Sequence, residues 1–236
     1  MTQPSTDNRD VWVVVPTYNE APVVQGVVKD LRRFFPNIVG VDDGSADDSA
    51  GQLAAGGAWV VRHAVNLGAG AALQTGLQFA LLDADARFFV TFDADGQHQT
   101  DDAVAMVERL RVESYDVLIG SRFLGRSEAM PVSRRLLLQA GRIFEWTTSG
   151  VRLTDAHNGL RAFTRRFAET VDLRLSDMAH ASELLGLIGG SGLPYAEHPT
   201  TVLYSDYSLA KGQRSINSVN IAMDVWLNLF LRGRRR

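Results

Sequence analysis

The sequence predicts an α/β fold in which a mostly parallel β-sheet carries helices on both faces. Two observations lead to this prediction. Short apolar runs alternate with segments of helical periodicity through residues 11–100, which is typical of parallel strands joined by helical crossovers. Polar residues follow the apolar runs, as PTYNE, DDGS and DADGQH. Parallel sheets bind ligands beyond the carboxyl ends of their strands, so these polar segments predict a shared site.

The individual elements follow from local patterns. The run 11–15 is apolar and stops at Pro16, as expected of a buried strand. Helical spacing in 21–35 ends at Pro36, and Ser45, Asp47 and Asp48 are suitable caps for a helix over 46–55. Further strands are predicted at 38–41, 59–62, 88–92, 117–120 and about 196–204, and further helices after the glycine turn NLGAG and at 101–112, 133–149 and 180–190. Residues 154–163 are expected to be irregular.

The 236 residues contain 45% hydrophobic side chains, enough for one sizeable core. We expect residues 1–9 to be disordered, 10–215 to form a single domain, and 216–236 to form an amphipathic helix with a basic tail. Within the domain, 10–100 would be the nucleotide-binding half and 101–215 the acceptor half. A formal net charge of -3 argues against a nucleic-acid partner, and the absence of cysteine excludes disulfides and thiolate metal sites. The start of the chain is unlike a signal peptide, and no apolar run reaches the roughly 18 residues of a transmembrane helix.

Asp93 and Asp95 directly follow the apolar run 88–92. At this spacing two carboxylates can converge on one cation, and Gln97 adds an oxygen at the next alternate position. Such hard ligands suit Mg²⁺ or Mn²⁺, which proteins often bind through one or two carboxylates plus substrate phosphates. A plain turn is the alternative for an isolated D-x-D pattern. His98 is either a further ligand or a hydrogen-bonding residue.

The ordered set PTYNE, VDDGS, NLGAGAALQTG, DADGQH and GSR resembles the family 2 glycosyltransferases of the Rossmann-like GT-A fold. Within that family the chain is similar to dolichol-phosphate mannose synthases and bacterial polyprenyl-phosphate glycosyltransferases over about residues 10–215. The resemblance implies an inverting transfer of sugar from a GDP- or UDP-sugar donor. It also implies that the D-x-D pair and Gln97 hold the metal and the donor diphosphate.

The resemblance assigns further residues to the nucleotide-sugar pocket. These are Pro16, Tyr18, Glu20, Val41, Asp43, Ala94, Asp95, Gln97, Arg122 and Lys211. Asp43 matches the position that reads the base, and a carboxylate accepts an N–H of either uracil or guanine. Asp42 either contacts the ligand or orients its loop. Many relatives have a basic residue at the position of Ala69, so the glycine loop is interpreted as structural support.

Acceptor-side residues are implied by the same resemblance. Arg134 corresponds to a basic position facing the acceptor phosphate, and for both Arg122 and Arg134 the alternative is a solvated surface charge. Asp155, in TDAHNGLRAF, and Glu183, in HASELL, match acidic family positions, although Ala156 replaces a common proline. With Asp95 they are the candidate catalytic residues. A hydroxyl acceptor needs a general base, first Asp155 and then Glu183, whereas a polyprenyl phosphate is already anionic and Asp155 would then only organise the site.

Residues 216–232 carry apolar residues at helical spacing and are followed by arginines. This pattern suits contact with an anionic membrane or a small membrane protein, although packing on the core is the alternative. We therefore expect a peripheral enzyme at the cytoplasmic membrane face with polyprenyl phosphate as its acceptor. The alternatives are a glycan acceptor in cell-wall or polysaccharide assembly and a non-catalytic nucleotide-sugar-binding protein. The lack of G-x-G-x-x-G after the first strand disfavours a dinucleotide-binding enzyme.

Overall fold

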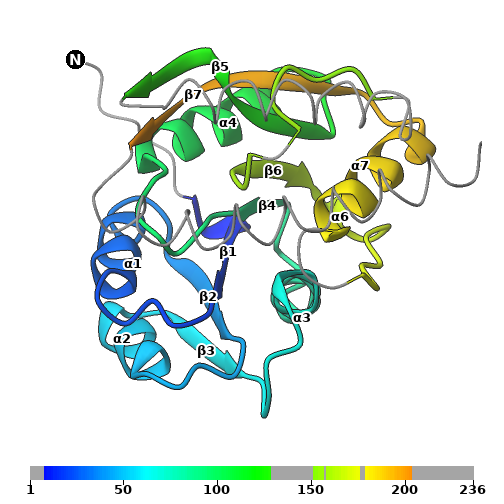
Figure 1. Cartoon of the computed structure of the whole chain (residues 1–236). Helices are drawn as coiled ribbons and strands as arrows, with labels where there is room; N and C mark the ends of the chain where they lie inside the picture. The colour runs from blue at the N-terminus through cyan, green and yellow to red at the C-terminus, as the bar shows by residue number, and fades with distance from the viewer. Residues whose placement is uncertain (1–7, 129–150, 157, 176–178, 204–236) are drawn as a thin grey trace, which may run out of the picture. The chain divides into compact units, whose positions relative to one another are not determined.

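The computed structural model describes residues 8–128, 151–156, 158–175 and 179–203 (Figure 1). Several predictions lie outside these ranges, namely the helix over 133–149, the C-terminal segment 216–236, and the roles of Arg134 and Lys211. The first compact unit ends at Leu203. None of the helices within the described ranges is long and apolar enough to cross a membrane.

The described chain forms one seven-stranded sheet in the order β3-β2-β1-β4-β6-β5-β7. The strands are β1 (Val11–Thr17), β2 (Asn37–Asp42), β3 (Trp59–Arg62), β4 (Phe88–Thr91), β5 (Val117–Glu128), β6 (Arg161–Thr164) and β7 (Tyr195–Leu203). All strand pairs are parallel except those of β6 with β4 and β5. The predicted mostly parallel α/β sheet is therefore confirmed. Strand β6 was missed, because residues 154–163 were expected to be irregular.

Helices cover both faces of this sheet, as predicted. They are α1 (Val24–Arg32), α2 (Ser49–Gly56), α3 (Ala69–Leu81), α4 (Thr100–Val112), α6 (Arg165–Ala168) and α7 (Ala179–Ser191). One core contains side chains of α3 and α7, and the other contains side chains of α1, α2 and α4. Strand β1 serves both cores, because Val14 points to the first and Val13 to the second. This two-sided burial explains why the strand is an unbroken apolar run.

The strand order predicts that a ligand site lies beside β1. From β1 the chain moves outward through β2 to β3, and then returns to β4 on the other side of β1. The carboxyl ends of β1, β2 and β4 therefore lie at the same edge, at a point where the winding direction reverses. Helix α3 packs closely beneath this edge, since a Cβ at Gly76 would lie 2.3 Å from Val14.

Two local predictions require correction. Asn8 and Arg9, which were expected to be disordered, belong to the 3-10 turn η1 (Asn8–Asp10) that precedes β1, and the Asn8 side chain donates to the Phe34 carbonyl at 3.0 Å. Helix α2 begins at Ser49, and its N-cap Asp48 makes no capping hydrogen bond through its side chain. Ser45 Oγ accepts the backbone N–H of Asn19 and Asp47 Oδ2 accepts that of Ala21, while Asp47 Oδ1 accepts the N–H of Ser49, the first residue of α2, at 3.0 Å.

Candidate active site

The turn after β1 is fixed by hydrogen bonds to the loop after β2. The Asn19 N–H donates to Ser45 Oγ at 2.9 Å, and the Glu20 N–H donates to Ser49 Oγ at 2.8 Å. Asn19 has a φ of 53°, a left-handed conformation that asparagine tolerates better than most residues. Glu20 is buried, whereas Tyr18 remains 44% exposed at the edge where the crevice is expected. The predicted donor residues of PTYNE thus sit on a preorganised turn.

Asp43, the residue predicted to contact the nucleobase of the donor, is held by the loop that follows β3. Its Oδ1 atom accepts hydrogen bonds from the Leu67 N–H at 2.9 Å and from His63 Nδ1 at 2.7 Å. Its Oδ2 atom accepts from the Gly68 N–H at 2.8 Å. The Val41 side chain is fully buried in the core, so only its backbone can face a donor.

The D-x-D segment places two carboxylates at the carboxyl end of β4. The Asp93 side chain is 45% exposed, and its Oδ2 lies 3.0 Å from His98 Nε2. Asp95 accepts from the Gln97 backbone N–H at 3.0 Å and from the Gln97 amide nitrogen at 2.6 Å. His98 is buried and packs edge-on against Phe92. The structure therefore gives His98 a hydrogen-bonding position beside the carboxylate pair.

Electrostatics at the pair fit a cation. Burial raises the pKa of Asp95, and the nearby Asp93 carboxylate raises it further. Burial also acts to raise the pKa of Asp93, but the hydrogen bond and charge of His98, together with the charges of Arg161 and His180, leave that pKa below its usual value. No group of three or more His, Cys, Asp or Glu within the described ranges is arranged to hold a metal ion. The two carboxylates would thus hold Mg²⁺ or Mn²⁺ only together with further oxygens, as such ions commonly bind with substrate phosphates.

Gly159 packs directly against the carboxylate of Asp93. A Cβ at Gly159 would lie 2.0 Å from Asp93 Oδ2 and 2.4 Å from Oδ1, so no larger residue fits beneath the carboxylate in this position. The neighbouring Thr91 hydroxyl donates to the Gly159 carbonyl at 2.7 Å. This glycine therefore limits where the carboxylate of the first acid can lie.

Arg122 and Asp155 form a buried ion pair. Arg122 Nε donates to Asp155 Oδ2 at 2.6 Å, and the Arg122 backbone N–H donates to the same oxygen at 3.1 Å. The two residues are 8% and 2% exposed, which excludes the alternative of a solvated surface charge for Arg122. Glu197 Oε1 accepts the backbone N–H of Asp155 at 3.1 Å and fixes this loop from β7. Asp155 is thus engaged as the partner of Arg122.

Glu183, the second candidate base, lies on α7 and is occupied by backbone groups. Its carboxylate accepts the N–H of Arg174 at 3.1 and 3.0 Å and the N–H of Leu175 at 2.9 Å. These bonds anchor the segment before α7 and give Glu183 a structural task. Its catalytic role remains a prediction.

Sequence reasoning missed Arg161. It is 2% exposed on β6, opposite Thr91 of β4 and Ile119 of β5. Burial lowers the pKa of its guanidinium, while the charges of Asp93 and Asp155 act to raise it. Among the described residues its Nε atom finds no hydrogen-bond partner. The sequence around Arg161 gives no sign of this placement, because only the folded sheet brings Arg161 near Asp93 and Asp155.

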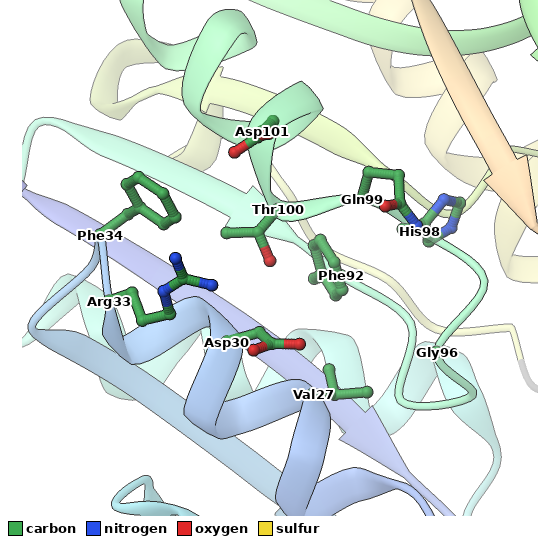
Figure 2. Close-up of a pocket in the computed structure, with 10 residues that line it drawn as sticks. All are labelled: Val27, Asp30, Arg33, Phe34, Phe92, Gly96, His98, Gln99, Thr100 and Asp101. Carbon is green, nitrogen blue, oxygen red and sulfur yellow. The ribbon is translucent and has the colours of Figure 1, made fainter. Parts of the chain in front are cut away.

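A hollow of about 270 Å³ lies beside the same D-x-D loop (Figure 2). Figure 2 shows Asp30 of α1 and Arg33, which follows that helix, on one side of it and Thr100 and Asp101 of α4 on the other. Of the candidate site residues, His98 lines this hollow, next to Gly96 of the D-x-D loop, whereas the two carboxylates and the predicted donor residues do not line it. The hollow therefore adjoins the D-x-D loop on the side of α1 and α4.

Comparison with known proteins decides the family. The model of "Glycosyl transferase family 2" matches residues 12–171. This range contains the motifs from PTYNE to TDAHNGLRAF and ends before Glu183. The chain belongs to glycosyl transferase family 2. The predicted enzyme class is thereby confirmed, and the dinucleotide-binding and non-catalytic alternatives lose their support.

Relatives in this family include enzymes named for polyprenyl-phosphate acceptors. The UDP-N-acetylglucosamine–dolichyl-phosphate N-acetylglucosaminyltransferase of Methanococcus voltae is 29% identical over 86% of this chain and 89% of its own. The undecaprenyl-phosphate mannosyltransferase of Micrococcus luteus is 31% identical over 69% of this chain and 70% of its own. An uncharacterised protein of Methanocaldococcus jannaschii is 36% identical over 91% of this chain and 90% of its own.

Solved structures confirm the GT-A fold. Mannosyl-3-phosphoglycerate synthase from Rubrobacter xylanophilus superposes with a TM-score of 0.63 and 18% identity, covering 94% of this chain and 75% of that one. Glucosyl-3-phosphoglycerate synthase from Mycobacterium tuberculosis, crystallised with Mn²⁺, UDP-glucose and phosphoglyceric acid, gives a TM-score of 0.62 at 18% identity over 81% of this chain and 70% of that one.

Proposed function

We propose that this glycosyltransferase transfers a sugar with inversion from a nucleotide-sugar to a polyprenyl phosphate, with Mg²⁺ or Mn²⁺ held by Asp93 and Asp95. The observation that carries the proposal is the partly exposed carboxylate pair at the winding reversal between β1 and β4. The metal, when bound, neutralises negative charge on the departing nucleoside diphosphate. The Gln97 amide would present its oxygen to the same site after a half-turn, since amide orientation follows the hydrogen-bond partners present.

The donor would lie over the carboxyl edge of the sheet. Tyr18 offers an exposed ring and Glu20 an acceptor on the fixed turn, with Pro16 beside them. The Ala94 side chain is buried in the core that α1 and α4 share, so only its backbone, between the two acids, can face the diphosphate. At the donor diphosphate, Arg122 would offset phosphate charge from a position held by Asp155. Lys211 and Arg134, outside the described residues, would add charge at the donor diphosphate and the acceptor phosphate as the family resemblance implies.

The state of both predicted bases supports a phosphate acceptor. Asp155 is bound to Arg122, and Glu183 is bound to backbone N–H groups. A carboxylate whose oxygens already accept such hydrogen bonds is poorly placed to take a proton from a hydroxyl, whereas an acceptor phosphate is anionic at neutral pH and needs no base. The acceptor named for the relatives from M. voltae and M. luteus is likewise a polyprenyl phosphate. We further propose that residues 216–236 bring the enzyme to the cytoplasmic membrane face, or to a small membrane protein there.

An acceptor panel tests this proposal. Purified full-length protein is given GDP- and UDP-sugars with Mg²⁺ or Mn²⁺, and nucleoside diphosphate release is measured with polyprenyl phosphate, with the matching polyprenol, and with glycans. We expect release that requires the phosphate group and is lost in Asp93→Asn. Asp101→Asn, an exposed acid on α4, is the matched control and should behave as the wild type. Release with polyprenol or glycans alone would assign the enzyme to hydroxyl acceptors instead.

A further inference from the structure

Asp43 belongs to a hydrogen-bonded chain of three side chains from three different elements. Asp43 follows β2, His63 follows β3, and Thr75 lies on α3. Asp43 Oδ1 lies 2.7 Å from His63 Nδ1, and His63 Nε2 lies 3.0 Å from Thr75 Oγ1. The side chains of Asp43 and His63 are 3% and 10% exposed. Such a chain fixes the orientation of its first member.

The chemistry of the partners sets the direction of each bond. An ionised carboxylate only accepts, so His63 Nδ1 carries the proton and donates to Asp43. In the neutral ring His63 Nε2 is then an acceptor, and the Thr75 hydroxyl donates to it. Asp43 thus sets the tautomer of His63, and Thr75 holds the opposite nitrogen of the ring in place.

The carboxylate of Asp43 is nearly saturated by its own chain. A carboxylate offers about four acceptor positions. In the described structure three are filled by N–H donors, namely His63 and Leu67 on Oδ1 and Gly68 on Oδ2. One position on Oδ2 remains, on a side chain of which only 3% is exposed. Asp43 can therefore meet one donor of a ligand, and a two-donor edge does not fit.

Nucleobases differ in the number of donors that they present to a carboxylate. Guanine offers two adjacent donors, N1–H and the exocyclic N2 amine, which a free carboxylate would accept side by side. Uracil offers a single imide N–H between two carbonyls. The amino groups of cytosine and adenine also offer a donor, but an imide N–H is more acidic and so donates more strongly to a charged acceptor.

We propose that the Asp43–His63–Thr75 chain is a specificity device that selects a uracil nucleotide over a guanine nucleotide. The inference rests on the proposed function, because it assumes that Asp43 faces the base of the donor. His63 and Thr75 are positioning residues that never touch the nucleotide. Bound guanine would leave one buried donor without an acceptor, which lowers affinity by about ten- to a hundredfold.

Nucleotide binding by the full-length protein tests the proposal. Affinities for UDP, GDP, CDP and ADP are measured by calorimetry with Mg²⁺ present. We expect UDP to bind at least about tenfold more tightly than each of the others. His63→Ala and the nearly isosteric Thr75→Val should bring the UDP-to-GDP ratio towards one, His63→Ala more strongly, because the carboxylate regains acceptor positions and freedom to rotate. Gln78→Ala, at an exposed position of α3, should leave the ratio unchanged.

Two results would overturn the inference. One is GDP binding as tightly as UDP to the wild type, and the other is a ratio that neither substitution moves. The wild-type panel and Thr75→Val decide the matter even where His63→Ala fails to fold. Failure of the proposed function is a separate result: uracil selectivity without sugar transfer to lipid would refute that function alone. Transfer from a guanine-based donor would support the function and refute the selectivity.

Discussion

Replacing Gly159 by alanine perturbs the metal site through a single methyl group. The new Cβ would lie 2.0 Å from Asp93 Oδ2, and Cβ contacts below 3.0 Å are essentially never found, so the carboxylate must retreat by at least about 1 Å. Gly159 does not have a positive φ, so alanine adds no backbone strain. A misplacement of about 1 Å in a catalytic site lowers the rate by about a hundredfold. We therefore expect kcat/KM to fall by about that factor, with a weaker apparent affinity for the metal.

The assay is nucleoside diphosphate release across a metal titration. Gly186→Ala on α7 is the matched control, because a Cβ there meets nothing within 4 Å. That variant should keep full activity and gain up to about 1 kcal/mol of stability from alanine's helix propensity. Activity of Gly159→Ala within about threefold of the wild type, at an unchanged metal requirement, would refute the claim that Gly159 sets the position of a carboxylate needed for catalysis.

Three further predictions concern the acidic residues. Asp155→Ala should lower the free energy of unfolding, measured by urea titration, by about 3–5 kcal/mol, because it leaves Arg122 buried without its partner. Adding Arg122→Met should recover part of that loss. A loss below about 1 kcal/mol for Asp155→Ala would contradict the stabilising role of the buried pair. Glu183→Gln should cost about 1–3 kcal/mol of stability while kcat/KM stays within a few-fold, and a thousandfold fall would restore Glu183 as a catalytic candidate. Burial and Asp93 raise the pKa of Asp95, so ionised Asp95 destabilises the metal-free fold as pH rises through that pKa. In the absence of metal, Asp95→Asn should then have a higher melting temperature than the wild type at pH 7. This difference in melting temperature should close below about pH 4, where the wild-type Asp95 is protonated and neutral like the asparagine. An equal difference at both pH values would exclude the charge of Asp95 as its cause.

The parallel part of the fold was predictable because burial leaves a strong signal there. Strands β1 and β4 are covered on both faces, so their sequences are continuous apolar runs. Strand β6 gave no such signal: Arg161 and Thr164 are two of its four residues, and the strand is held by its antiparallel neighbours. Its position in the middle of the sheet is a property of the whole topology, which a local pattern does not contain.

The candidate site was predictable where a residue directly follows a strand. Asp43 directly follows β2, and Asp93 and Asp95 lie in the loop that begins after Thr91 of β4, so the sheet edge brings their segments together. The partners of these acids were hidden by distance along the chain. His63 lies 20 residues from Asp43, and Gly159 lies 66 residues from Asp93. The sequence pattern therefore shows neither the hydrogen bond that holds Asp43 nor the close packing against Asp93. For Glu183, a matched motif position identified the residue but not the backbone groups that occupy it.

Direct detection of the lipid product tests the central claim most closely. Full-length protein, a nucleotide-sugar and polyprenyl phosphate are incubated with a divalent metal, and the extracted lipid is examined by mass spectrometry. The account predicts a lipid heavier by one sugar residue, carried on the phosphate with inverted anomeric configuration, and absent after chelation of the metal or in Asp93→Asn. An unmodified lipid alongside nucleotide release to another acceptor, or full product formation without metal, would contradict it.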